Sequence, residues 1–251
     1  MQNRPCLCCG DGTHAGILHG RRGLLARGIA AGLVATGLPR APALSASAVA
    51  HTTLTPDQAL DQLKKGNDDY QHGAPYSFAH DRPRRVELAR GQAPFAVLVG
   101  CSDSRVPPEL LFGRGLGELF IVRNAGNTVD TAALGSIEYG VGVLGCPLVV
   151  VLGHEGCGAV AAALEMVERN ATFPGVIGEM VQPILPAVLS ARGADGKLSL
   201  DDAVIANARR VAMRLKTQSP VLQAAISQKK LKVVAARYDL DDGDVRWFED
   251  A

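Results

Sequence analysis

The sequence has few aromatic residues, no overall basic excess and few cysteines, and each shortage argues against a class of protein. Aromatic residues make up 4% of the 251 positions, and the net charge is +1 at pH 7. Nucleic-acid surfaces need clustered Lys and Arg, so this composition argues against nucleic-acid binding. Six cysteines in so long a chain argue against a disulfide scaffold. The body of the chain also lacks internal repeats and low-complexity tracts.

Residues 1–48 differ from the rest and resemble a bacterial export signal. They carry a net charge of +4, which leaves −3 for residues 49–251. The segment 21–25 (RRGLL) resembles a twin-arginine motif, and an apolar stretch at 28–38, too short to span a bilayer, follows it. Small residues at 46–48 (ASA) suit a cleavage site. We therefore predict twin-arginine export of a folded, metal-loaded protein to the periplasm, with cleavage near Ala48 and no stable membrane anchor.

Two alternatives stay open for this leader. The arginine-rich stretch could form an amphipathic surface helix instead of a signal. Cys6, Cys8 and Cys9 could form a metal cluster, although a leader that is later discarded is the simpler interpretation.

The body of the chain alternates short apolar runs with helical patterns. Continuous apolar runs, typical of strands buried on both faces, lie at 95–99, 119–122, 148–152 and 232–237. Helical spacing predicts helices that begin at the N-cap Thr55 and end near Gly66-Asn67, and others at 131–144, 159–168 and 202–216. This alternation predicts one α/β domain, residues 49–251, with a mainly parallel central β-sheet flanked by helices. The segment 165–200 gives no clear pattern.

Three residues at the ends of predicted strands form a candidate zinc site. Cys101 follows the first strand, and His154 and Cys157 follow the third. Sites in open α/β sheets form outside the carboxyl ends of the strands, so these side chains should meet. Two thiolates and an imidazole suit tetrahedral zinc, and three protein ligands leave a fourth position for water or substrate. The pattern therefore predicts a catalytic zinc site.

A carboxylate and a guanidinium lie close to the first ligand. Zinc lowers the pKa of a water that it binds, and Asp103 can accept a hydrogen bond from that water. Arg105 can hold Asp103 in place and keep it ionised. The alternative for this pair is a surface ion pair. Gly156 and Gly158 flank Cys157 and let the backbone approach the metal at the start of a helix, which favours a thiolate there.

Several segments resemble the β-class carbonic anhydrases. The two signature segments are matched at 101–107 (CSDSRVP) and 153–160 (GHEGCGAV), and the intervening strand and helix at 118–127 and 135–139. The resemblance runs from about Thr55 to Trp247. It implies Cys101, His154 and Cys157 as ligands of one Zn²⁺ per subunit, with Asp103 and Arg105 as the catalytic dyad.

The resemblance also implies an activity and an assembly. The activity is reversible hydration of CO₂ to bicarbonate and a proton, by attack of a zinc hydroxide that the dyad orients. In some members Asp103 would replace the water as fourth ligand in a closed state at low pH. Gly158 is a candidate substrate contact. The family forms homodimers or homotetramers with the site near the subunit interface, where Leu60 and Leu63 lie either in that contact or in the core.

Two positions depart from the family pattern. Arg114 aligns where many members have a glutamine near the substrate pocket, so it either strengthens bicarbonate binding or points to solvent. Leu98 stands where members with a regulatory bicarbonate site have Trp, which argues against that regulation. His72 and His80 do not identify a proton shuttle. The competing functions are a CS₂ or COS hydrolase on the same scaffold and a non-catalytic zinc-binding module.

Overall fold

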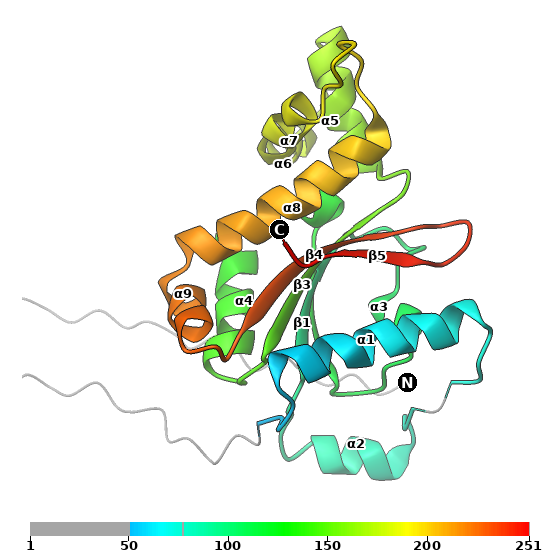
Figure 1. Cartoon of the computed structure of the whole chain (residues 1–251), viewed down its shortest axis with the longest axis vertical. Coiled ribbons are helices and arrows are strands. Elements are labelled where there is room, and N and C mark those ends of the chain that lie inside the picture. The colour runs from blue at the N-terminus through cyan, green and yellow to red at the C-terminus, as the bar shows by residue number, and fades with distance from the viewer. Residues whose placement is uncertain (1–50, 77, 251) are drawn as a thin grey trace, which may run out of the picture. The chain divides into compact units, whose positions relative to one another are not determined.

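The structure is a computed structural model, and it describes residues 51–76 and 78–250 (Figure 1). The predicted export signal, its cleavage site and Cys6, Cys8 and Cys9 lie outside the described residues. The strands are β1 (Ala96–Gly100), β2 (Leu119–Arg123), β3 (Leu148–His154), β4 (Lys232–Tyr238) and β5 (Val245–Phe248). The α-helices are α1 (Pro56–Gln71), α2 (Arg82–Leu88), α3 (Pro108–Leu111), α4 (Thr131–Gly142), α5 (Gly158–Arg169), α6 (Ile177–Val181), α7 (Leu185–Ser190), α8 (Leu200–Gln218) and α9 (Pro220–Ser227). Two 3₁₀ turns are η1 (Ala125–Asn127) and η2 (Gln182–Ile184).

The sheet has the order β2-β1-β3-β4-β5. The first four strands are parallel, and β5 pairs antiparallel with β4. All residues of β1 and β3 are buried, as continuous apolar runs require in a sheet covered on both faces. The prediction of one α/β domain with a mainly parallel sheet is confirmed.

Each face of the sheet carries its own apolar layer. Val97 and Val99 of β1 pack in the layer formed with α4, α8 and α9. Ala96 and Leu98, which alternate with them, pack in the layer formed with α1 and α3. Figure 1 shows α1 on one side of the strands and α4, α8 and α9 on the other.

The first helix shows how a local signal and a distant contact combine. Thr55 caps α1 by accepting a hydrogen bond from the Gln58 backbone N–H, and the Gln58 side-chain oxygen accepts one from the Thr55 backbone N–H. The expected end near Gly66 was wrong, because α1 continues to Gln71. Gly66 is instead a contact position, since a Cβ there would lie 2.0 Å from the Phe112 carbonyl oxygen. Leu60 and Leu63 lie in the core.

The poorly patterned segment 165–200 holds the end of α5, then α6, η2 and α7. With the start of α8, these elements form a third apolar cluster that encloses Cys101 and Cys157. Among the described residues, no helix combines the length and apolarity needed to cross a bilayer.

Candidate metal centre

The three predicted ligand residues meet at the carboxyl end of the sheet. Cys101 directly follows β1, His154 is the last residue of β3, and Cys157 is the N-cap of α5. Because β1 and β3 are parallel neighbours, their carboxyl ends lie side by side. The ligand atoms of all three residues lie within 4.8 Å of one another. The side chains are 6%, 0% and 1% exposed, so the group is buried.

His154 has one ring nitrogen bonded and one free. Its Nδ1 lies 2.8 Å from the Glu155 carbonyl oxygen, which can only accept, so Nδ1 carries the proton. Its Nε2 is buried and has no hydrogen-bond partner. A buried acceptor without a partner is costly, and a metal ion satisfies it. The orphaned Nε2 is therefore direct structural support for a metal here.

The two sulfurs lie 4.0 Å apart, within hydrogen-bonding distance for sulfur. The hydrogen bond from Cys157 lowers the pKa of Cys101, against the effect of burial, and the Gly126 N–H adds to that lowering. The neighbouring Cys101 thiolate raises the pKa of Cys157. The N–H groups of Val160 and Ala159 act the other way, as expected at a helix start, but Cys101 outweighs them.

This donor set fits zinc. Two sulfurs that are each about 2.3 Å from a tetrahedral zinc lie about 3.8 Å apart, close to the separation seen here. A dication also removes the repulsion that prevents both sulfurs from being thiolates at once. The three donors plus one open position are the arrangement of a catalytic zinc site rather than a closed structural one.

Asp103 and Arg105 form a closely bonded pair beside the donors. Arg105 Nε donates to Asp103 Oδ1 over 3.0 Å and Nη2 donates to Oδ2 over 2.7 Å, while the Arg105 backbone N–H also reaches Oδ1. These hydrogen bonds hold the pKa of Asp103 far below its usual range. Asp103 Oδ2 lies 3.9 Å from His154 Nε2, so the carboxylate faces the donor group. The pair thus lies directly beside the three donors, with the carboxylate side mostly buried.

Three residues hold the loops of the site from other elements. Arg123, the last residue of β2, donates to the carbonyl oxygens of Cys101 (2.8 Å) and Asp103 (2.6 Å). Glu155 accepts from the Leu240 N–H, which ties the loop after His154 to the turn between β4 and β5. Asn207 of α8 donates to the Gly126 carbonyl oxygen. The sequence carries no local signal for these roles, because each partner is distant in the chain.

Other predicted positions fall elsewhere. Gly158 begins α5 beside Cys157, with open space where a Cβ would stand. Arg114 neither lines the metal centre nor points freely to solvent, since it donates to Gln62 of α1 and to the Phe112 carbonyl oxygen. His72 and His80 are exposed.

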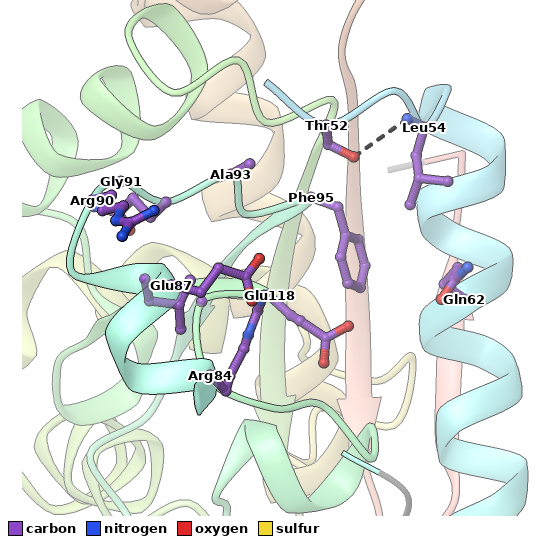
Figure 2. A pocket seen from close by; sticks show the side chains of 13 residues that line it. Thr52, Leu54, Gln62, Arg84, Glu87, Arg90, Gly91, Ala93, Phe95 and Glu118 are labelled. Atoms are coloured by element: carbon purple, nitrogen blue, oxygen red, sulfur yellow. Dashed lines mark hydrogen bonds and ion pairs between the residues drawn. The ribbon is translucent and has the colours of Figure 1, made fainter. Parts of the chain in front are cut away.

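A separate pocket of about 640 Å³ lies at the amino end of the strands, between α1 and α2 (Figure 2). Phe95, which directly precedes β1, lines it together with Arg84 and Glu118. None of the metal-site residues is among its lining residues. This pocket is therefore separate from the place where the donor atoms converge.

Comparisons with known proteins identify the family. The carbonic anhydrase family model matches residues 96–245. The chain belongs to the carbonic anhydrase family. The protein named carbonic anhydrase 2 of Mycobacterium tuberculosis is 40% identical over 188 residues, which cover 75% of this chain and 90% of that protein. A carbonic anhydrase of Mycolicibacterium smegmatis is 38% identical over 190 residues, covering 76% and 92%.

Solved structures place the chain in the β class of carbonic anhydrases. A tetrameric β-carbonic anhydrase of Sordaria macrospora superposes with a TM-score of 0.59 and 28% identity, covering 67% of this chain and 88% of that one. A Coccomyxa β-carbonic anhydrase in complex with acetazolamide gives 0.58 and 29%, covering 75% and 83%. The predicted resemblance to β-class carbonic anhydrases is thus confirmed.

Proposed function

We propose that this carbonic anhydrase is a zinc enzyme that uses Cys101, His154 and Cys157 as metal ligands, with one Zn²⁺ per subunit. Its reaction is the reversible hydration of CO₂ to bicarbonate and a proton. The observation that carries the proposal is the buried three-donor group, with its orphaned His154 Nε2, next to the Asp103–Arg105 pair.

Cys101, His154 and Cys157 would hold the zinc, and the bound ion would supply an acidified water as nucleophile near neutral pH. Asp103 would accept a hydrogen bond from the nucleophile and so direct its lone pair at the substrate carbon. Because Arg105 keeps the pKa of Asp103 far below neutral, Asp103 stays an acceptor and does not take up the proton that the reaction releases. That proton leaves to buffer. The Gly158 N–H, at the start of α5, is the proposed contact for a substrate oxygen.

At low pH we propose a closed state in which Asp103 becomes the fourth ligand. Arg105 donates to both Asp103 oxygens in this structure, and the closed state would exchange at least one of these contacts for the metal.

We propose that the chain forms homodimers, or tetramers built from them. Strand β2 lies at the edge of the sheet and α2 has no buried residue, so both leave contact surface uncovered within the described residues. The β-carbonic anhydrase of Sordaria macrospora is tetrameric. Light scattering of the mature protein tests this proposal, and a monomer at micromolar concentration would reject it.

Export to the periplasm through the twin-arginine machinery is also a proposal, supported by the sequence of residues 1–48. N-terminal sequencing of protein secreted from cells tests it. We expect the mature chain to begin near residue 49, and an exported chain that begins at Met1 would reject cleavage.

Stopped-flow CO₂ hydration between pH 6.5 and 9 tests the activity. We expect a rate that rises with pH, that is lost after zinc is removed by a chelator, and that returns when zinc is added. No activity at pH 9 with zinc bound would reject the function. Turnover of CS₂ or COS far above that of CO₂ would favour the hydrolase alternative. The structural-module alternative is not favoured, because it needs a closed ligand set and has no use for the Asp103–Arg105 pair.

A further inference from the structure

A chain of two hydrogen bonds connects helix α8 to the sulfur of Cys101. The Gly126 N–H lies 3.2 Å from Cys101 Sγ, and the Gly126 carbonyl oxygen accepts a 2.9 Å hydrogen bond from Asn207 Nδ2. Gly126 thus hydrogen-bonds through its N–H to a proposed metal ligand and through its carbonyl oxygen to helix α8, which supplies none of the proposed ligands.

Both ends of this connection are fixed. Asn207 is 2% exposed on α8, where its neighbours Ala203, Val204, Ala208 and Val211 pack into the apolar clusters. Gly126 has a positive φ of 66°, and a Cβ there would lie 2.7 Å from Ile184 Cδ1 and 3.0 Å from Ala159 Cβ. The 3₁₀ turn η1 therefore packs closely against α5 and η2 on one side and is hydrogen-bonded to Asn207 of α8 on the other.

We infer that Asn207 is a positioning residue that aims the Gly126 N–H at Cys101 and thereby sets how strongly this thiolate donates to the metal. The inference rests on the proposed zinc site. The N–H and the carbonyl of Gly126 belong to different peptide groups, so Asn207 acts by orientation and not by polarising the N–H itself.

The physical consequence follows from the charge on sulfur. A hydrogen bond to a thiolate withdraws electron density that would otherwise pass to the metal, and this matters most where two thiolates already offset the charge of the dication. Without Asn207 the turn is held on one side only, so the N–H···S bond weakens. Cys101 then becomes a stronger electron donor, and its position becomes less well defined.

The test compares Asn207→Asp and Asn207→Ala with the matched control Ser219→Ala. Ser219 is also fully buried, at the junction of α8 and α9, and donates to Glu138 far from the metal centre. Each variant is loaded with Co²⁺ for the sulfur-to-cobalt charge-transfer band, and with Zn²⁺ for the rate of zinc transfer to a chelator.

In folded Asn207 variants we expect the sulfur-to-cobalt charge-transfer band to move to lower energy. We also expect zinc transfer to the chelator to accelerate about tenfold, the lower end of the range of effects when a residue that positions a metal ligand is removed. Ser219→Ala should keep both values. An unchanged band with transfer within twofold of the wild type would overturn the inference, as would an equal change in Ser219→Ala. A wild-type protein that binds neither metal would instead overturn the proposed zinc site.

A measurement on the unmutated protein covers the case in which neither Asn207 variant folds. In ¹¹³Cd-substituted protein, we expect a scalar coupling between the metal and the amide proton of Gly126, transmitted through the hydrogen bond to Cys101 Sγ. The inference would be overturned if the Gly126 amide signal is resolved and shows no coupling to cadmium while the protons of the ligand cysteines do show such coupling.

Discussion

The two ends of the parallel strands are built in opposite ways. At the carboxyl end, Cys101 and His154 are buried, and His154 Nε2, which has no hydrogen-bond partner, lies near the two sulfurs. At the amino end, a pocket of about 640 Å³ lies between α1 and α2, and α2 has no buried residue. The lining there mixes charges of both signs, such as Arg84 and Glu118.

The two ends differ in whether donor atoms converge, and metal binding requires convergence rather than open volume. At the carboxyl end, the candidate ligand atoms lie within 4.8 Å of one another. The parallel strands end side by side there, so the loops that follow them bring the donor side chains together within a few residues. The amino end has space without convergence.

The strongest test of this comparison removes a ligand at one end and a lining residue at the other. We expect Cys101→Ser to lose bound zinc and at least about a thousandfold in kcat/KM, because an alcohol is a poor zinc ligand and the reaction depends on the metal. Metal analysis and stopped-flow hydration measure both effects. Gln92→Ala, in the exposed pocket lining, should keep both within twofold. Equal losses in the two variants would contradict the comparison.

The second test removes the carboxylate that directs the nucleophile. We expect Asp103→Asn to lower kcat/KM by about a hundredfold with zinc content unchanged, because the amide cannot replace an ionised acceptor. Arg105→Lys should fall between Asp103→Asn and the wild type, since Lys cannot make the two-point contact seen here. Wild-type kcat/KM in Asp103→Asn would remove the dyad from the mechanism.

The smallest expected effect belongs to an ion pair at the amino end. Lys64 lies 2.6 Å from Glu249 and is the main cause that lowers the pKa of Glu249; Lys232 also contributes. A carboxyl whose pKa is lower in the folded state stabilises the fold above its unfolded pKa of about 4.3. That stabilisation is lost as the pH falls through the folded value.

We therefore expect Lys64→Met to cost about 0.2–1 kcal/mol at pH 7, because both side chains are about two-fifths exposed and solvent screens the pair. The difference from the wild type should shrink as the pH falls below about 4.3 and through the lowered pKa of Glu249. Urea unfolding at several pH values measures it, and Lys65→Met controls for the loss of a helix charge. A cost that does not shrink as the pH falls, or any change in kcat/KM, would contradict a purely stabilising role.

Strands and ligands could be predicted from the sequence because their signals are local. Continuous apolar runs marked β1 to β4 within one or two residues; β1 and β3 are fully buried and β4 mostly so, while the edge strand β2 is half-buried. Cys101, His154 and Cys157 were predictable because strand ends and short spacings bring them together. The Asp103–Arg105 pair lies two residues apart for the same reason.

The remaining features depend on contacts that the sequence does not show. Helix α2 has no buried face, so it produces no apolar stripe. Strand β5 is four residues long, includes Arg246, and forms an edge of the sheet. Gly66 looked like a helix end because its contact with Phe112 is tertiary. Asn207 lies 81 positions from Gly126, and a lone Asn on a helix gives no indication of such a partner.

The position of Arg123 has a consequence for how this protein can change over time. This residue ends the edge strand β2, and its guanidinium holds the two carbonyl oxygens that bracket Ser102. In the proposed dimer, a partner chain docked against β2 would contact the strand whose last residue holds the loop from Cys101 to Asp103. Under that proposal, substitutions along this edge would alter subunit contact and loop position together.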